Sequence, residues 1–204
     1  MQERKAYTIF AIFALALTVL CADTYAQPVD FPDPNLRAAI LGALDIADLP
    51  EVKLDASVLR LLLRDLNAGG RGISDLTGLE HVTSLTLLLL HGNAISDLRA
   101  LTPLVNLTSV RLDGNQINDL SPLADLTELT TLALDGNNIT DISPLANLTQ
   151  LTALGLGTNN ITDISHLANL TGLTHLVLRD NNITDVTPLA NLSLIHISEP
   201  TRPY

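Results

Sequence analysis

Aspartates at a fixed spacing are the first residues of this sequence with the chemistry to bind a ligand. They recur every 22 residues, and the segment from Asp135 to Asp141 resembles a calcium loop. However, the loop glycine and final glutamate of an EF-hand are absent, and Ile139 stands at a ligand position. Stacked carboxylates repel one another, so we expect each to accept backbone N–H groups where a helical turn begins. The sequence therefore predicts a structural column and no metal ion; its members are Asp75, Asp97, Asp119, Asp141, Asp163 and Asp185.

Two histidines are the next candidates, as a general acid and a general base. His91 and His175 occupy the same repeat position four repeats apart, or about 19 Å at the usual strand separation. That distance is too long for both rings to reach one substrate atom. Cys21 is the single cysteine, and no glycine-rich phosphate loop opens a helix. We therefore expect no catalytic residue, no cofactor and no enzymatic activity.

A 22-residue repeat must position these side chains. Leucines with a period of two precede the pentad Asn-x-Ile-x-Asp and predict a short strand. A hydroxyl residue and a proline follow, so Ser143 is expected to be an N-cap with Pro144 at the first helical position. An asparagine amide offers both donors and an acceptor, so a stacked column can satisfy backbone groups at each turn. The predicted structural ladder is Asn93, Asn115, Asn137, Asn159 and Asn181.

The pattern L-x-x-L-x-L-x-x-N-x-I resembles the leucine-rich repeat consensus, in the short form found in internalin-like bacterial surface proteins. Six units cover residues 63–192, and the first has Arg71 in place of the ladder asparagine. The resemblance implies an α/β fold: an open, horseshoe-shaped solenoid with a parallel β-sheet on the concave face and short helical turns on the convex face. It also implies a role in protein recognition.

The segments outside the repeats differ in composition. Residues 1–26 combine Arg4 and Lys5 with an apolar run, and predict a secretory signal peptide cleaved after Ala26. Residues 27–62 contain Asp33-Pro34 followed by apolar residues up to Ala43 and Leu44 at helical spacing, which predicts an N-terminal helical cap. Residues 193–204 leave the repeat frame and resemble a translated sequencing adapter. We expect this tail to be non-native and the final coil to be uncapped.

Charge and apolar length restrict the partners. The chain has 11 Lys+Arg and 22 Asp+Glu, a net charge of −11, which disfavours a nucleic-acid partner. The apolar run near the N-terminus is only about a dozen residues, too short for a membrane span. We therefore expect a monomer that is secreted or held in the periplasm or at the cell surface.

The predicted binding surface is the concave face, where the residues flanking the inward leucines differ between repeats. A protein ligand is expected, and a glycan is the alternative. Two other readings stay open: a spacer without a specific ligand, and the recognition arm of a larger protein such as an adhesin or an enzyme. The candidate residues are Leu87, Leu89, His91, Ser109, Arg111, Asp113, Thr131, Ala133, Asp135, His175, Val177 and Arg179. Arg111 and Arg179 are the members of a type that commonly forms interface hot spots.

Overall fold

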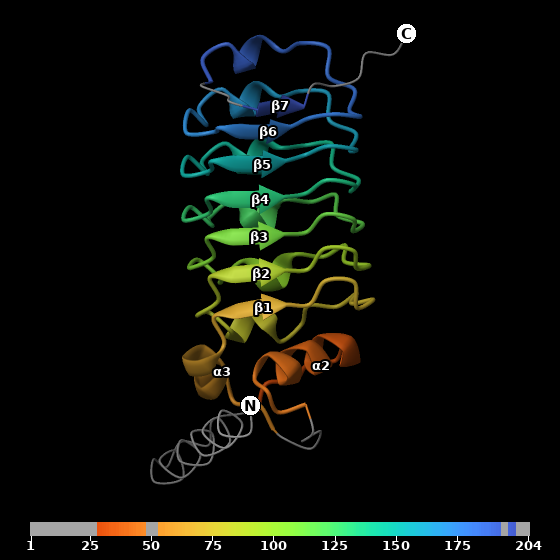
Figure 1. Ribbon diagram of the computed structural model, residues 1–204, viewed down its shortest axis with the longest axis vertical. Coiled ribbons are helices and arrows are strands. Elements are labelled where there is room, and N and C mark those ends of the chain that lie inside the picture. Colours follow the sequence, from red (N-terminus) through yellow and green to blue (C-terminus); the bar gives the residue numbers. More distant parts are fainter. Residues whose placement is uncertain (1–27, 48–52, 193–195, 199–204) are drawn as a thin grey trace.

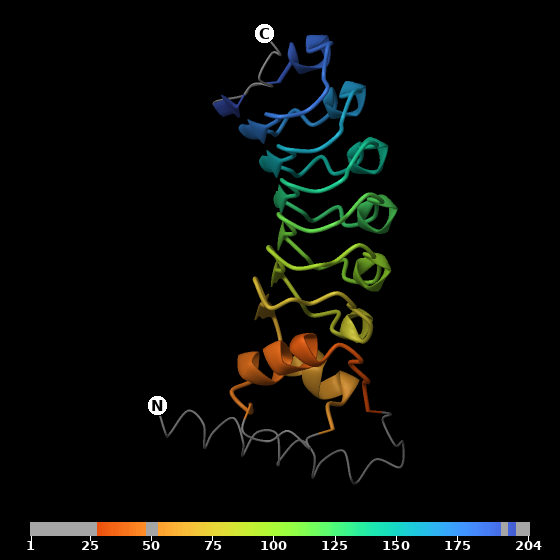
Figure 2. The same ribbon diagram turned by 90° about the vertical axis from the view of Figure 1, so that its right-hand side faces the viewer.

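The repeats form a stack of coils, each with a short strand on one side and a helical turn on the other (Figures 1 and 2). This computed structural model describes residues 28–47, 53–192 and 196–198. The stack is bowed, and the sheet lies on its concave side (Figure 2). The expected α/β solenoid is therefore confirmed.

Seven strands form one parallel sheet in sequence order. Each strand from the first to the fifth pairs with residues 22 positions further on, as in Leu88↔Val110 and Leu132↔Leu154. The 22-residue period thus fixes the register of the sheet. The strands are β1 (Asp65–Asn67), β2 (Leu87–Leu89), β3 (Ser109–Arg111), β4 (Thr131–Ala133), β5 (Ala153–Gly155), β6 (His175–Val177) and β7 (His196–Ser198).

The convex side carries one short 3-10 helix per coil. Asp141 Oδ1 accepts the Ser143 N–H at 2.8 Å, and its counterparts make the same contact, so the predicted role of the aspartate column is confirmed. The expectation that Ser143 is the N-cap is wrong. Ile142 holds that position, because the aspartate two residues upstream already satisfies the free amide. The helices are η1 (Leu79–His81), η2 (Arg99–Leu101), η3 (Ser121–Leu123), η4 (Ser143–Leu145), η5 (Ser165–Leu167) and η6 (Thr187–Leu189).

The core is a column of aliphatic side chains between the sheet and the 3-10 helices. Leu134, Ile139 and Leu145 are fully buried, and their counterparts in neighbouring coils are equally enclosed. The core thins at the sixth coil, where Val186 is 52% exposed although its counterpart Ile164 is 1% exposed. Each inner coil is therefore buried by its neighbours on both sides, as expected for a solenoid, whereas the sixth is partly exposed.

Two helices cover the N-terminal end of the stack. They are α2 (Pro34–Ala43) and α3 (Ala56–Leu62), and α2 packs beneath β1 (Figures 1 and 2). Asp33 is the N-cap of α2. The expected apolar face differs at one position: Ala43 is exposed at the end of the helix, whereas Leu41 is buried. Among the described residues, neither helix has the length and hydropathy to cross a membrane.

A seventh strand lies over the sixth. β7 pairs in parallel with β6 and covers the strand of the final coil, whereas the convex side of that coil remains exposed at Val186. Ile197 of β7 faces Leu176, a step of 21 residues (197 − 176) instead of 22, which agrees with the predicted loss of register. The rest of the tail (193–195 and 199–204) and the signal peptide with its cleavage site after Ala26 lie outside the described residues.

Candidate functional site

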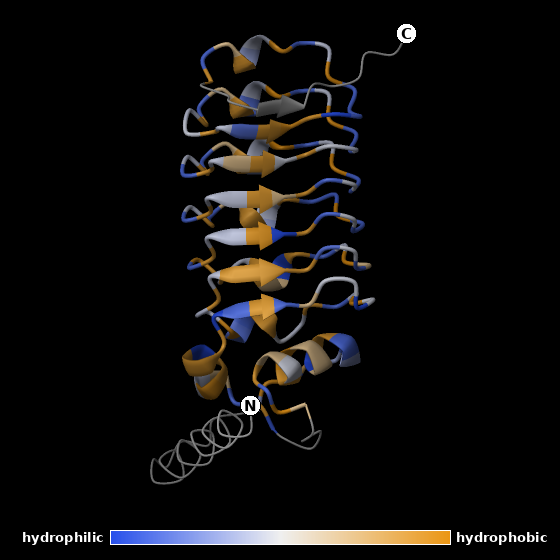
Figure 3. Ribbon diagram, viewed as in Figure 1, coloured by the Kyte–Doolittle hydropathy of each residue, from blue (hydrophilic) through white to orange (hydrophobic). Residues whose placement is uncertain are grey.

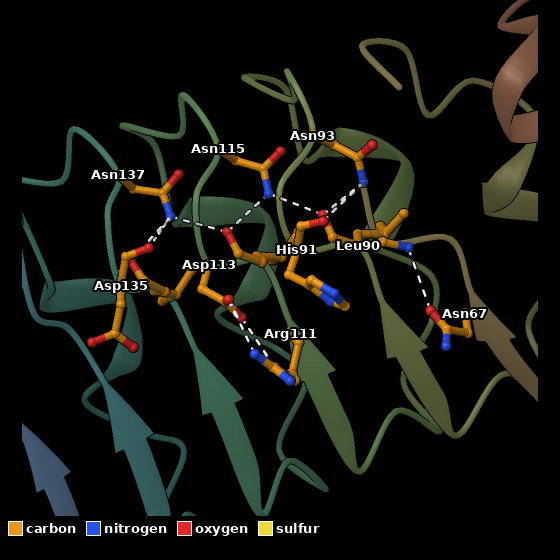
Figure 4. Close-up of polar contacts among 12 residues, drawn as sticks. Asn67, Leu90, His91, Asn93, Arg111, Asp113, Asn115, Asp135 and Asn137 are labelled. Carbon is orange, nitrogen blue, oxygen red and sulfur yellow. Dashed lines mark hydrogen bonds and ion pairs between the residues drawn. The ribbon is translucent and has the colours of Figure 1, made fainter. Parts of the chain in front are cut away.

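The asparagine ladder holds the turn that follows each strand. Asn137 Nδ2 donates to Leu134 O in its own coil and to Leu112 O in the preceding coil, both at 3.0 Å. Its Oδ1 accepts the Ile117 N–H at 3.0 Å. Figure 4 shows Asn93, Asn115 and Asn137 in one row with this pattern. Because each amide binds backbone groups of two coils, it fixes the ends of the strands and therefore the side chains on the concave face.

The concave face presents the side chains on either side of the buried central residue of each strand. In β4 the central Leu132 is buried, whereas Thr131 and Ala133 are half-buried. Figure 3 shows β2 hydrophobic along its whole length, whereas β3 and β6 combine polar and apolar residues. A regular backbone thus displays a surface whose character changes from repeat to repeat.

An ion pair lies on this face within the third coil. Arg111 Nε donates to Asp113 Oδ1 at 3.1 Å, and a second nitrogen of the guanidinium donates to the other carboxylate oxygen at the same distance (Figure 4). The side chain of Asp113 is 27% exposed. A two-point contact orients the guanidinium, so Arg111 is held in place before any partner arrives.

Asp135 lies over the two glycines of the next repeat. Its Oδ1 accepts the Gly157 N–H at 3.0 Å, and its carboxylate overlaps the position that a Cβ at Gly155 would take. Burial is the largest of the causes that raise the pKa of Asp135, and the nearby Asp113 carboxylate adds to it. The Gly157 N–H and Arg179 oppose that shift without cancelling it. The carboxylate is therefore held in place by a hydrogen bond, although its surroundings disfavour its negative charge.

His91 has a similar arrangement in the second coil. Its imidazole ring occupies the space above Gly69, where a Cβ would overlap the ring atoms. The ring Nδ1 is buried and has no hydrogen-bond partner among the described residues. Neither contact was expected from the sequence. The sequence did contain one indication of them, a glycine at a concave-face position. A glycine there has no side chain and leaves room for the side chain of the adjacent repeat.

The structure brings some of the candidate residues together and separates others. Arg111 contacts Asp113, and Asp113 lies near Asp135. His91 follows β2 and His175 begins β6, so three strands separate them. Among the described residues, no group of three or more histidines, cysteines or acidic residues could hold a metal ion.

Comparison with known proteins places the chain among leucine-rich repeats. The family model for leucine rich repeats in two copies matches residues 127–169 and again residues 149–191. No curated protein matches the sequence at a significant level.

Several solved structures are similar. An internalin of Listeria monocytogenes, InlF, is 39% identical with a TM-score of 0.78, over 84% of this chain and 51% of its own. Internalin C2 of the same organism is 31% identical with a TM-score of 0.50, over 87% of this chain and 99% of its own. A leucine-rich repeat protein of Leptospira interrogans is 25% identical with a TM-score of 0.62, over 72% of this chain and 40% of its own. The chain spans about half of InlF.

Proposed function

The chain belongs to the internalin-like family of leucine-rich repeat proteins, and we propose that it is an exported module that binds a protein partner through its concave face. A protein-interaction module is the general role that this fold supports. The proposed activity is non-enzymatic and needs no cofactor.

One observation supports the concave face most strongly: its polar side chains are already fixed without a partner. Arg111 is held by Asp113, and Asp135 is held by the amide of Gly157. Fixed side chains lose little conformational entropy on binding, so more of the contact energy contributes to affinity. Leu87 and Leu89 add an apolar area on β2, next to the arginine.

The test compares two arginines that form the same kind of ion pair on opposite sides of the molecule. Arg111 pairs with Asp113 on the concave face, and Arg99 pairs with Asp97 on the convex side. For an isolated partner, we expect Arg111→Ala to weaken the affinity about tenfold, which is about 1.4 kcal/mol. Arg99→Ala should leave it unchanged. If both Arg111→Ala and Leu89→Ala leave the affinity intact, the concave-face assignment is wrong.

Export is a separate part of the proposal and rests on residues 1–26. Basic residues before a short apolar run, with small residues before position 27, are the pattern of a cleavable signal. The test is mass spectrometry of the protein recovered from outside the cytoplasm of a bacterial host. A mature N-terminus at Gln27 supports export, and an intact Met1 in a cytoplasmic fraction contradicts it.

The second candidate is the recognition arm of a larger surface protein. The alignment with about half of InlF favours it. A long sequencing read of the genomic locus beyond the codon for Asn191 tests this reading. Further repeats in frame support it, and a natural stop codon after Tyr204 contradicts it.

A further inference from the structure

A hollow of about 820 Å³ lies on the flank of the first coils, next to the N-terminal cap. Arg60 of α3 and Arg64, just before β1, line one part of it. The segments that lead into β2, β3 and β4 line the rest. Figure 1 shows α3 beneath the side of the sheet where the strands begin. The volume is within the range of ligand sites.

The guanidinium groups of both arginines in the hollow are available to bind an anion. Among the described residues neither forms an ion pair, and Arg60 uses only its Nε, which donates to Ala56 O at 3.1 Å. Three other arginines of the described chain are paired with aspartates: Arg99 with Asp97, Arg111 with Asp113 and Arg179 with Asp180. Two unpaired guanidinium groups in one hollow of a chain with a net charge of −11 form a local site for an anionic group.

The flank of the repeats offers hydrogen-bond acceptors, in contrast to the donors of the two arginines. Thr108 Oγ1 donates to Thr86 O at 3.2 Å, so its hydrogen is used and its lone pairs remain free. Asn106 Nδ2 donates to Thr83 O at 2.8 Å, and its Oδ1 remains an acceptor. Val105 also lines the hollow, is 49% exposed and adds an apolar contact. The hollow thus combines cationic donors beside α3 with neutral acceptors along the coils.

We propose that this hollow binds an acidic segment of a partner protein in an extended conformation. Side-chain carboxylates bind the guanidinium groups of Arg60 and Arg64, which match them in planar two-point contacts. Main-chain N–H groups of the same segment donate to the oxygens of Asn106 and Thr108. Glu128, at the far end of the lining, repels a second carboxylate there and therefore orients the segment with its acidic part towards α3.

This site lies outside the concave face and does not depend on the function proposed for that face. A second hollow, between η1 and η2, provides an internal contrast. Its lining includes Asp75, Glu80 and Asp97 with the single cation Arg99, which is already paired. An acidic peptide is repelled there, so binding should be confined to the flank beside α3.

The experiment measures fluorescence anisotropy of a short glutamate-rich peptide titrated with the full chain, beside serine-rich and lysine-rich peptides. We expect the acidic peptide alone to bind, with an affinity that falls as salt is added. Arg60→Gln and Arg64→Gln should each weaken binding about fivefold, and the double variant should abolish it. Arg71→Gln is the matched control, because Arg71 is also exposed, has no ion pair among the described residues and lies beyond the opposite end of β1.

Three outcomes overturn the proposal. Equal weakening by Arg71→Gln means that only net charge is sensed. Loss of peptide binding in Arg111→Ala moves the site to the concave face. Arginine-dependent binding of a sulfated oligosaccharide, with none of the peptide, assigns the hollow to a glycan. Because all three arginines are exposed, the variants should melt at the same temperature as the parent chain, which separates loss of binding from loss of folding.

Discussion

The carboxylate of Asp135 lies in the space that the missing side chain of Gly155 leaves free in the next repeat. The contact joins the segment that follows β4 to the last residue of the neighbouring strand β5. It places a half-buried negative charge on the surface proposed to meet a partner, in a position that is unfavourable for the charge itself. Because burial disfavours the ionised form, this charge opposes folding at a pH at which it is ionised.

The first prediction concerns this carboxylate. Asp135→Asn keeps an acceptor for the Gly157 N–H and removes the charge, so we expect the variant to be more stable at neutral pH by less than about 1 kcal/mol. The pKa of Asp135 is raised in the folded state, so the ionised form opposes folding at high pH. The difference between variant and parent should therefore vanish as the pH falls below about 4. Urea unfolding at several pH values measures it, and lower stability of the variant at neutral pH contradicts the interpretation.

The second prediction concerns the asparagine ladder. Asn137→Ala leaves the buried Ile117 N–H without its partner. It also removes one of the two bonds accepted by the carbonyl groups of Leu112 and Leu134, which keep those from Asn115 and Asn159. An unpaired buried N–H costs about 1–3 kcal/mol and each lost bond about 1 kcal/mol, so we expect a loss of about 3 kcal/mol in the free energy of unfolding. Asn138→Ala is the control, since Asn138 is exposed and contributes its backbone N–H. Similar losses for both variants would show that the ladder is not specific.

The third prediction is a pH dependence of the cap. Asp33 accepts the N–H groups of Asn35 and Leu36 in α2 and those of Ser74 and Asp75 in the first repeat. Burial raises the pKa of Asp33, but these four amides lower it further than burial raises it. Because the folded pKa lies below the unfolded one, the stabilisation is complete above the unfolded pKa and is lost as the pH falls through the folded one.

Asp33→Asn should therefore lose about 2 kcal/mol at neutral pH and show a flatter acid limb below about pH 4. Thermal unfolding followed by circular dichroism across that range measures both effects. Asp55→Asn is the matched control, since Asp55 caps α3 without a hydrogen bond from its side chain to the repeats. An acid limb unchanged in Asp33→Asn would exclude this carboxylate as its source.

The fourth prediction concerns a strained turn. Thr158 has a φ of 54°, whereas Gly136 has the same role one coil earlier with a φ of 66°. A β-branched residue is unfavourable in this left-handed region, so Thr158→Gly should raise stability by about 1 kcal/mol. Thr162→Gly, at an exposed position in the same coil with no positive φ, should instead lower it. Differential scanning calorimetry of the two variants distinguishes a local backbone effect from a general one.

Much of the fold follows from the period alone. Leu132 and Leu154 occupy equivalent positions in adjacent coils and therefore have the same kinds of neighbours. Once the strand and the turn of one repeat are identified, those of every other coil follow. The aspartate column was predictable for the same reason. The N-cap was not, because a serine before a proline is typical of an N-cap, whereas here Asp141 accepts the N–H of Ser143 and the helix begins at Ser143 itself.

The concave face was predictable in outline only. Alternation along Thr131, Leu132 and Ala133 shows which side chains point outwards. It does not show that Asp135 leans across to Gly155, since that contact depends on which residues meet in the same column of adjacent repeats. The same limit applies to the hollow beside α3, because its lining joins a cap helix to coils distant in the sequence.

Each ladder amide binds only within its own coil and to the one before it: Asn137 reaches Leu134 and Asp135 in its own coil, and Leu112 and Ile117 in the preceding one. Excision of an internal segment of 22 residues would therefore leave every remaining asparagine with partners of the same type. Gain or loss of one whole repeat would therefore lengthen or shorten the array without disturbing either end. The length of the surface offered to a partner can thus change in steps of one repeat. Related proteins can therefore differ in the length of the array before their contact residues differ.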